Sequence, residues 1–350
     1  MGLWIVEKPF ATLNSSHVRN IRTSWFPFFL GLIFFIAILN DIFFPKTTDP
    51  KNESIEEKSW HVPDINLVPQ KTAEGDLIRY GRELIVNTSK YLGPRGTVAQ
   101  ITNGMNCQNC HIEAGTGLPV NSFFAVASTY PRYRDRSGRV ESIEFRVNDC
   151  LQRSLNGKPI DSLSKEMRAI VAYLKWLGKD VKPGKKLFPG TVGLSFLERA
   201  ADTLKGKIIF QDKCQRCHQS HGQGVLDFDS AGYRYPPLWG ANSYNASAGM
   251  YRISSLAIFI KYNMPFDLAV NGPQLSDEEA WDVAAFICSQ PRPVKNFPED
   301  WPKLESKPID FPFGPYTDAF TQRQHKYGPF LPIKEAHISL RNSKEKSKKF

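Results

Sequence analysis

Cysteine and methionine are scarce in this 350-residue chain, which has six Cys and five Met. Four of the cysteines fall in two short motifs, so only Cys150 and Cys288 remain, and a disulfide framework is not indicated. Long Lys/Arg runs are also missing before residues 342–350, despite a formal net charge of +10. We therefore expect no nucleic-acid-binding arm, and a basic surface that attracts small anions or acidic proteins.

What the chain does contain is a repeated Cys-X-X-Cys-His motif. The two copies are Cys107-Gln108-Asn109-Cys110-His111 and Cys214-Gln215-Arg216-Cys217-His218. Two thiols at this spacing add to the porphyrin vinyl groups and the adjacent imidazole binds iron, so the motif predicts covalent c-type haem. A structural zinc site would need a second Cys or His pair nearby, which neither copy has. The chain is expected to carry two covalently bound haem c groups.

Length and periodicity predict a mainly α fold with two haem domains, because 350 residues can bury two ordinary cores. Each motif lies between an opening and a closing amphipathic segment. These segments are 76–85 and 164–177 in the first half, and 204–210 and 275–287 in the second. Gly81 and Gly206 would let the closing helices cross closely, and Phe210 would stack on Phe286. This is the plan of two tandem cytochrome c-type domains.

The N-terminus carries an uncharged, largely apolar stretch, residues 23–40, which is long enough to span a bilayer. Lys8, Arg19 and Arg22 precede it and mixed charges follow, which predicts a cytoplasmic start and an exported remainder. A cleaved signal peptide is the alternative, but no small-X-small cleavage pattern follows the apolar run. We expect a single-pass anchor in the inner (cytoplasmic) membrane, with the bulk of the chain facing the periplasm or exterior.

The predicted domain plan follows from these features. In order it comprises a cytoplasmic N-terminus (1–24), a transmembrane anchor (25–44), a polar linker (45–72), a first cytochrome c domain (73–184), a linker (185–200), a second cytochrome c domain (201–292) and a Pro/aromatic-rich C-terminal arm with a basic tail (293–350). Residues 293–340 show no sustained helical period. We expect this arm to be extended and to wrap over one or both domains, since its aromatic residues would otherwise be exposed.

The distal ligand of each iron decides whether a haem can meet a substrate. In the second half we expect Met264, because Met264-Pro265 ends an apolar helix and precedes the closing segment; Met250 is the alternative. In the first half Met105 lies too close to the motif, and Met167 lies within the closing helix. Another residue type must therefore ligate the first iron.

Cys150 lies between the haem motif and the closing segment of the first half, the position that corresponds to Met264 in the second half. If Asn148 or Asp149 caps a short helix, Cys150 and Ser154 share one face of it. The nearby Arg146 would favour the thiolate, which is the form that binds iron and attacks sulfur. An inert buried thiol is the alternative.

Arginines are concentrated around this cysteine. Six lie between positions 132 and 153, namely Arg132, Arg134, Arg136, Arg139, Arg146 and Arg153. Four acids are interleaved with them, so a surface ion-pair network of little energetic value is one interpretation. The other is an oxyanion site, because guanidinium groups suit a tetrahedral oxyanion better than ammonium groups do.

Several segments of the predicted exported part match one family pattern. They are both haem motifs, Tyr130-Pro131-X-Tyr133, Arg136-X-Gly138, Phe145–Gly157, Tyr262-Asn263-Met264-Pro265, Phe313-Gly314-Pro315-Tyr316 and His325–Phe330. In these segments the sequence resembles the dihaem c-type thiosulfate dehydrogenases, which interconvert thiosulfate and tetrathionate. The resemblance implies a catalytic first haem with axial His111 and Cys150. It implies an electron-transfer second haem with axial His218 and Met264.

The same resemblance implies that Arg136, Arg146 and Ser154 hold the sulfonate of the substrate. Some family members have Lys directly before the Met ligand, where this chain has Asn263, so an exchange of Lys for Met on the iron is not expected here. The predicted anchor differs from soluble periplasmic members. It suggests that electrons pass to a cytochrome or a redox protein in or at the membrane.

The implied reaction runs through Cys150. Its sulfur leaves the iron and forms a thiosulfonate adduct with one thiosulfate, a second thiosulfate attacks the adduct, and tetrathionate departs while two electrons pass through the two haems to an acceptor. The direction depends on haem potentials, which the sequence does not fix. Two alternatives remain: a dihaem electron carrier without sulfur chemistry, and the Cys-ligated haem subunit of the multienzyme sulfur-oxidation system.

Overall fold

The computed structural model describes residues 61–117, 119–182, 192–228 and 232–347. All of them belong to one unit, residues 60–350, that is distinct from residues 1–59. The predicted anchor, residues 25–44, therefore lies outside the described residues. Within the described ranges, every helix is too short or too polar to cross a bilayer.

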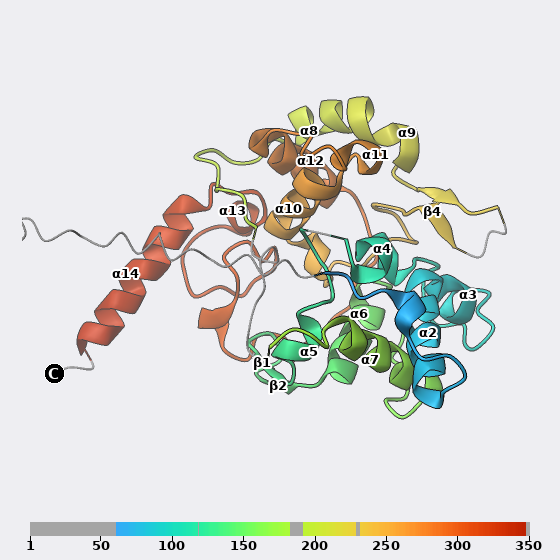
Figure 1. Ribbon diagram of the computed structural model, residues 1–350. Helices are drawn as coiled ribbons and strands as arrows, with labels where there is room; N and C mark the ends of the chain where they lie inside the picture. The colour runs from blue at the N-terminus through green and yellow to red at the C-terminus, as the bar shows by residue number, and fades with distance from the viewer. Residues whose placement is uncertain (1–60, 118, 183–191, 229–231, 348–350) are drawn as a thin grey trace, which may run out of the picture. The chain divides into compact units, whose positions relative to one another are not determined.

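The described chain is mainly helical, as predicted, and falls into two halves followed by a C-terminal segment (Figure 1). The helices of the first half are α2 (Ala73–Val86), α3 (Thr88–Leu92), α4 (Ile112–Gly115), α5 (Val126–Thr129), α6 (Ile143–Arg153) and α7 (Lys165–Leu177). Those of the second half are α8 (Thr203–Ile209), α9 (Gln215–His218), α10 (Ile253–Asn263), α11 (Phe266–Ala269) and α12 (Asp277–Ser289). The π-helical turn η3 (Phe210–Cys214) links α8 to α9.

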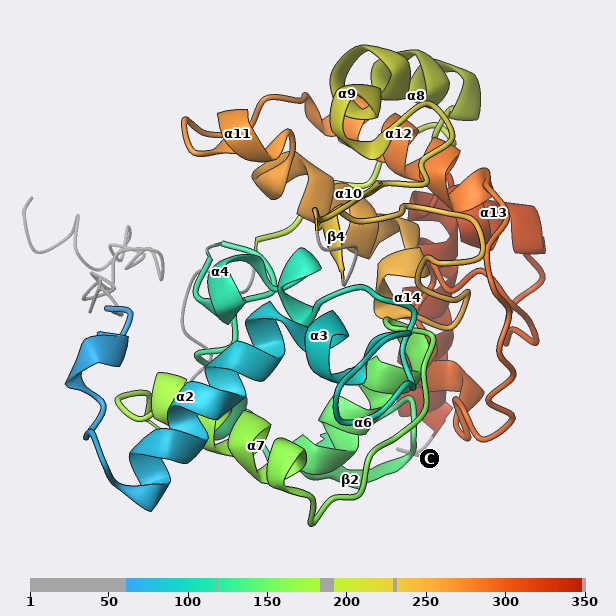
Figure 2. The same ribbon diagram turned by 90° about the vertical axis from the view of Figure 1, so that its right-hand side faces the viewer.

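In each half the opening helix packs on the closing helix, α2 on α7 and α8 on α12 (Figure 2). A Cβ on Gly81 would lie 2.0 Å from the Ala169 carbonyl oxygen, and one on Gly206 would lie 1.9 Å from that of Asp282. Since no side chain fits at such distances, glycine is required at both crossings. The prediction of close crossings at these glycines is confirmed.

Aromatic side chains fill the core of the second half around its helix crossing. The rings of Phe210 and Phe286 lie 5.5 Å apart, as predicted, and Trp239 is 5.0 Å from Phe210. The closing helix α12 begins at a capping box, in which the Ser276 hydroxyl accepts from the Glu279 N–H and the Glu279 carboxylate accepts from the Ser276 N–H.

Helix α6 carries Cys150 and differs from the expected short helix. It begins after Ser142, whose hydroxyl accepts from the Phe145 N–H, so the prediction of a cap at Asn148 or Asp149 is wrong. Ser142 caps the helix instead because the next residue, Ile143, is apolar and buried, with 7% of its surface exposed. Arg146 therefore lies within the helix rather than ahead of it, one turn before Cys150.

Two short hairpins complete the halves. In the first, β1 (Arg132–Arg134) pairs antiparallel with β2 (Arg139–Glu141), with Tyr133 opposite Val140. In the second, β3 (Val225–Leu226) pairs with β4 (Tyr233–Tyr235). The first hairpin leads directly into α6, so it fixes the residues of its turn beside that helix.

The C-terminal segment is extended only as far as Phe330. It contains the 3₁₀ turn η5 (Leu304–Ser306) and the short helix α13 (Gln322–Tyr327), and then continues as α14 (Leu331–Ser347). The expectation of no helix through residue 340 is wrong for α14. Pro332 is tolerated there because it lies in the first turn, and Ile333, at 0% exposure, anchors the helix to the core.

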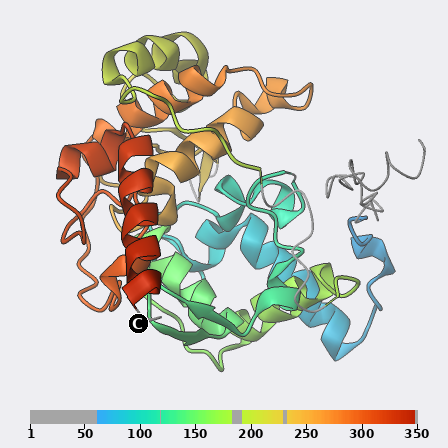
Figure 3. The same cartoon turned by 90° about the vertical axis from the view of Figure 1, so that its left-hand side faces the viewer.

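This arm, residues 293–330, is tied to both halves, as expected (Figure 3). Asp310 accepts from Arg252 in the second half, with the Nε contact at 2.9 Å. Asp300 accepts from both terminal nitrogens of Arg153 in the first half, each at 2.7 Å. The arm thus connects the two halves through buried ion pairs.

Candidate functional site

The first Cys-X-X-Cys-His motif forms the turn η2 (Cys107–Asn109) and ends at the start of α4. The Nδ1 of His111 donates to the Asn121 carbonyl at 2.6 Å, and its ring stacks on Phe123 at 4.1 Å. A Cβ on Gly115 would come within 1.9 Å of the Phe123 ring, so glycine is needed there for the ring to approach. The imidazole is thereby held in one tautomer, with Nε2 unprotonated.

The second motif repeats this arrangement. Nδ1 of His218 donates to the Pro236 carbonyl at 2.9 Å, and the side chain is buried. Met264 follows α10 directly, its N–H donating to the Ile260 carbonyl at 3.0 Å, and its side chain packs against the core of the second half. Asn263 before it is buried as well.

The alternative distal methionine, Met250, lies against the first half. Its sulfur is 3.9 Å from the side-chain nitrogen of Asn121, the residue whose carbonyl holds His111. Met250 packs on the core of the second half, as Met264 does, but its sulfur also contacts the loop of the first haem motif. This contact favours Met264 over Met250 as the expected ligand.

These donor sets fit covalent haem. Each half offers two thiols and an imidazole whose Nδ1 is already bonded, which leaves Nε2 for iron. Burial lowers the pKa of His111 to about 4 and also lowers the pKa of His218, so both rings are neutral at pH 7 and can ligate. The residues that would hold the first haem are Cys107, Cys110, His111 and Cys150, and those for the second are Cys214, Cys217, His218 and Met264.

Cys150 lies close to the first haem motif. Burial, together with the charge of Cys150, raises the pKa of the Cys110 thiol to about 12, and Cys150 contributes likewise at Cys107. The charge of Cys150 is also the largest influence on Arg146, whose pKa it raises. Arg146 therefore stays cationic beside the Cys150 sulfur.

Five of the six arginines around Cys150 fall into two groups, and the sixth, Arg134, is half-buried at the end of β1. Arg132 and Arg139 are exposed on the hairpin, in keeping with a surface role. Arg136, Arg146 and Arg153 are instead partly or fully buried and share two carboxylates. The structure therefore separates a solvated group from an inner cluster.

Arg153 occupies the centre of the inner cluster. Its Nε donates to Asp149, which also accepts from Arg146, and its other two nitrogens donate to Asp300. The guanidinium also lies 3.7 Å from the Phe297 ring centroid. With every nitrogen engaged, Arg153 has no free edge for a ligand.

Arg136 and Arg146, the two arginines that the resemblance implies, keep free donors. One nitrogen of Arg136 donates to the Ser247 carbonyl at 3.1 Å, and its Nε lies 4.0 Å from Asp300. Burial, and then the neighbouring Arg153, lower its pKa to about 10, against the opposing charges of Asp149 and Asp300, so it is still a cation at pH 7. Ser154 ends α6 one turn after Cys150, its N–H donating to the Cys150 carbonyl at 2.8 Å. The four predicted catalytic residues thus belong to α6 or the hairpin before it.

Sequence reasoning missed the contribution of the distant chain. Asp300 and Trp301 lie about the inner cluster although Asp300 is 147 positions from Arg153. Asn245, from the second half, donates to the Gln152 carbonyl at 2.9 Å and to the Asn156 side chain at 3.0 Å. No local pattern signals these contacts, because they arise only when the arm and the second half fold against α6.

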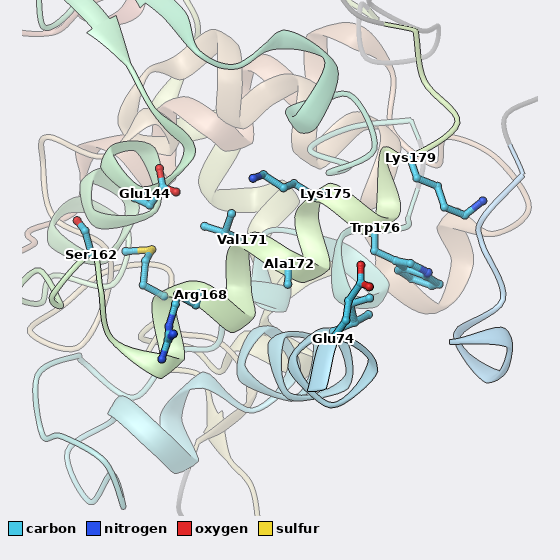
Figure 4. Close-up of a pocket in the computed structure, with 11 residues that line it drawn as sticks. Glu74, Glu144, Ser162, Arg168, Val171, Ala172, Lys175, Trp176 and Lys179 are labelled. Carbon is cyan, nitrogen blue, oxygen red and sulfur yellow. The ribbon is translucent and has the colours of Figure 1, made fainter. Parts of the chain in front are cut away.

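A pocket of about 520 Å³ lies elsewhere, lined mainly by α7 together with residues of α2 and α6 (Figure 4). Glu74, Glu144, Arg168, Lys175 and Lys179 are among its lining residues. It includes neither a haem-motif residue nor any of the inner arginines. We therefore place the candidate site at α6 rather than in this pocket.

Comparisons with known proteins agree with this organisation. Residues 97–182 match the family model described as SoxA/TsdA, cytochrome c domain, and residues 203–291 match that of cytochrome c. The chain is 37% identical to the thiosulfate dehydrogenase of Allochromatium vinosum over 237 residues, which cover 67% of this chain and 84% of that protein. It is 39% identical to the thiosulfate dehydrogenase of Stutzerimonas stutzeri over 248 residues, 70% of this chain and 77% of that protein.

One solved structure shares the fold. It is the thiosulfate dehydrogenase (TsdBA) from Marichromatium purpuratum in its as-isolated form, with a TM-score of 0.60 and 28% identity. The match covers 70% of this chain and 51% of that chain, so this chain spans about half the length of the solved one.

Proposed function

Since this chain belongs to the thiosulfate dehydrogenase family, we propose that it couples two thiosulfate ions to one tetrathionate at the site formed around Cys150. The observation that supports this most directly is the pairing of a cysteine sulfur with arginines that keep free donors. A pure electron carrier gains nothing from such a site. Two cytochrome c domains in the same chain imply two c-type haems.

Thiosulfate binding is assigned to Arg136, Arg146 and Ser154. The sulfonate end carries three oxygens, which suit the free N–H groups of the two arginines and the hydroxyl of Ser154. One turn of α6 separates Arg146 from Cys150, and another separates Cys150 from Ser154. A sulfonate held by these groups leaves its sulfane sulfur close to the Cys150 sulfur.

Cys150 then acts as the nucleophile and later as the leaving group. Its thiolate forms a bond to the sulfane sulfur of the first thiosulfate, and two electrons leave as the Cys–S–S–SO₃⁻ adduct forms. The sulfane sulfur of the second thiosulfate attacks the former sulfane sulfur of the first, which is the adduct sulfur bonded to Cys150 Sγ. The bond from that sulfur to Cys150 breaks, and tetrathionate departs. Cys150 returns as thiolate, and no proton is transferred. The cationic Arg146 lies one turn of α6 before Cys150 throughout this cycle.

When bound, the two haems supply the one-electron acceptors that the reaction needs and the route to an external partner. His111 and Cys150 would hold the haem iron in the first half, and His218 and Met264 would hold it in the second. Met264 lies in an apolar setting without nearby arginines of the inner cluster, which suits electron transfer rather than anion binding.

We also propose that residues 25–44 anchor the protein in the inner membrane, with the haem domains on the periplasmic or outer side. The support is the uncharged run 23–40 and the basic residues before it. Its electron partner would then be a cytochrome or redox protein at that membrane. Membrane fractionation with an alkaline carbonate wash tests this, since an anchored chain stays in the pellet and a cleaved one is released.

The activity test uses purified protein carrying both haems. Thiosulfate-dependent reduction of a redox dye and tetrathionate-dependent oxidation of the reduced dye are measured in parallel, with tetrathionate quantified as product. The proposal expects turnover with free thiosulfate and stoichiometric tetrathionate. A carrier without sulfur chemistry would give neither reaction, and a subunit that joins thiosulfate to a carrier protein would give no free tetrathionate.

A further inference from the structure

The C-terminal arm contacts the inner arginine cluster, although residues 293–347 lie outside both matched cytochrome c segments. Asp300 binds Arg153 through two hydrogen bonds of 2.7 Å, and its carboxylate lies 4.0 Å from Nε of Arg136. Its side chain is 15% exposed and that of Arg153 is 7% exposed. The pair is therefore largely shielded from water, where bidentate ion pairs are strong and geometrically specific.

The next residue of the arm fixes Arg136 itself. The Trp301 backbone N–H donates to the Arg136 carbonyl at 2.6 Å, and the Arg136 guanidinium lies 5.3 Å from the Trp301 ring. Phe311 presents a second ring at 5.7 Å, set edge-on to Trp301. The arm therefore contacts Arg136 in two ways: it donates a hydrogen bond to the backbone carbonyl, and it places two aromatic rings beside the guanidinium.

The turn that carries Arg136 is shaped to receive this arm. A Cβ on Gly138 would lie 2.4 Å from Cγ of Pro302, and Gly138 has a φ of +65°. Only glycine combines this backbone conformation with so close a contact. The hairpin turn and residues 300–302 of the arm are therefore complementary surfaces.

The arm also decides which arginines are free. Asp149 accepts one hydrogen bond from Arg146 and one from Nε of Arg153. The other two nitrogens of Arg153 donate to Asp300. Arg136 lies beside two aromatic rings, and Asp300 approaches its Nε only to 4.0 Å, so Arg136 keeps N–H groups that these contacts do not use. An arrangement without Asp300 would leave Arg153 free to compete for the anion.

We infer that the C-terminal arm is part of the thiosulfate site, with Asp300 and Trp301 as positioning residues that occupy Arg153 and orient Arg136 toward the sulfonate. This inference rests on the proposed function. Neither residue touches the substrate; each acts through an arginine. The arm thereby controls the affinity for the dianion rather than the bond-forming step.

The test uses full-length protein with both haems and steady-state thiosulfate oxidation. Asp300→Asn removes one of the two acceptors facing Arg153 and is expected to raise KM about tenfold, equivalent to about 1.4 kcal/mol, with little change in kcat. Trp301→Leu removes the ring beneath Arg136 and is expected to raise KM about fivefold. Trp301→Phe retains a ring and is expected to stay within about twofold of the wild type, because the buried indole N–H has no hydrogen-bond partner to lose among the described residues.

Phe330→Leu is the matched control. Phe330 ends the same arm but packs in the core of the second half, with its ring 5.7 Å from that of Trp281. This variant is expected to keep the wild-type KM. Absorption spectra and midpoint potentials of both haems are recorded for every variant, because a positioning role changes KM while leaving them unaltered.

Equal KM values for wild type, Asp300→Asn and Trp301→Leu would overturn the inference, as would an equal rise in Phe330→Leu. A lower KM in Asp300→Asn would also overturn it, because the loss of a negative charge would then matter more than the position of Arg136. If Asp300→Asn fails to retain both haems, Trp301→Leu decides, since it leaves every ion pair in place. Wild-type protein without thiosulfate turnover would instead overturn the proposed function. The two failures are therefore distinguished by the wild-type rate.

Discussion

The two haem domains share a scaffold but differ around the proposed distal ligand. In both, a glycine on the opening helix lies against a carbonyl of the closing helix, at Gly81 and Gly206. In both, the motif histidine donates from Nδ1 to a loop carbonyl. The parts that hold a haem are thus nearly the same.

The difference lies in the segment between motif and closing helix. Cys150 is within α6 and is surrounded by arginines and carboxylates, whereas Met264 follows α10 and packs on an apolar core. One scaffold therefore supports two tasks, and the charge around the distal residue distinguishes them. The predictions below alter one domain at a time, beginning with the largest expected effect.

Replacing Cys150 by Met would make the first domain resemble the second. Thiosulfate turnover should fall by at least about 10³-fold, because the residue that forms the sulfur–sulfur bond is lost. Both haems should remain attached, since the thiols of the two motifs are unchanged. Steady-state rates and the pyridine haemochrome content measure the two quantities.

Cys288→Ala serves as its control. Cys288 is buried on α12, with its thiol donating to the Tyr251 carbonyl at 3.5 Å. It should retain turnover within about twofold, because a buried thiol of this kind contributes packing rather than chemistry. Wild-type activity in Cys150→Met would remove the proposed distinction between the domains.

Arg146→Lys tests whether guanidinium geometry matters beside Cys150. We expect kcat/KM for thiosulfate to drop about 10- to 100-fold, because a lysine offers a point charge and no planar pair of donors. Arg139→Lys, on the exposed part of the hairpin, should leave kcat/KM for thiosulfate unchanged. Equal effects in the two variants would indicate general electrostatic attraction instead of a specific site.

Gly81→Ala and Gly206→Ala test the shared scaffold. Each new Cβ meets backbone oxygen, so each should cost about 1–3 kcal/mol in the free energy of unfolding. Gly249→Ala, where an added Cβ has nothing within 4 Å, should be close to neutral. Denaturant unfolding midpoints provide the comparison. A large effect in one domain only would show that the two crossings are not equivalent.

Asp149→Asn is expected to have the smallest effect, and this effect on the free energy of unfolding depends on pH. Burial opposes its ionisation, but Arg146 and Arg153 outweigh burial and lower its pKa. A carboxyl with a lowered folded-state pKa stabilises the fold above its unfolded pKa of about 3.9, and this contribution is lost as the pH falls through the folded value. Wild type should therefore exceed Asp149→Asn in unfolding free energy at neutral pH, and the difference should shrink on acidification.

The second domain supplies the contrast for this experiment. Asp277→Asn removes a carboxylate that is 49% exposed and paired with Lys261 at 2.8 Å. Such an exposed ion pair is worth about 0–1 kcal/mol, so its loss should change stability little at any pH. A pH-independent difference between wild type and Asp149→Asn would contradict the role assigned to the buried carboxylate.

Local patterns in the sequence predicted those features that are encoded within a few residues. The haem motifs, the crossing glycines and the Phe210–Phe286 contact belong to this class. The start of α6 was mispredicted because Ser142 and Asn148 are both acceptable caps, and only the burial of Ile143 favours the earlier one. Helix α14 was missed because Pro-rich composition ahead of it masked the change in periodicity.

The role of the arm could not be predicted from the sequence. Asp300 follows Pro298-Glu299 in a segment with many aromatic residues, and nothing local distinguishes it from Glu299. Its importance comes from a partner 147 positions away. Contacts of this kind depend on how the arm returns across the domains, which composition and periodicity do not specify.

Asn245 gives the domain arrangement a further consequence. Its backbone N–H donates to the Arg153 carbonyl at 3.1 Å and its side chain donates to Gln152, so a residue of the second domain satisfies carbonyl groups at the end of α6. Asn245 is fully buried in doing so. A fragment that ends between the two domains would expose these carbonyls to water. Exchange of the second domain for an unrelated cytochrome would remove these hydrogen bonds, together with those of Arg136 to Ser247 and of Asn103 to Ser243.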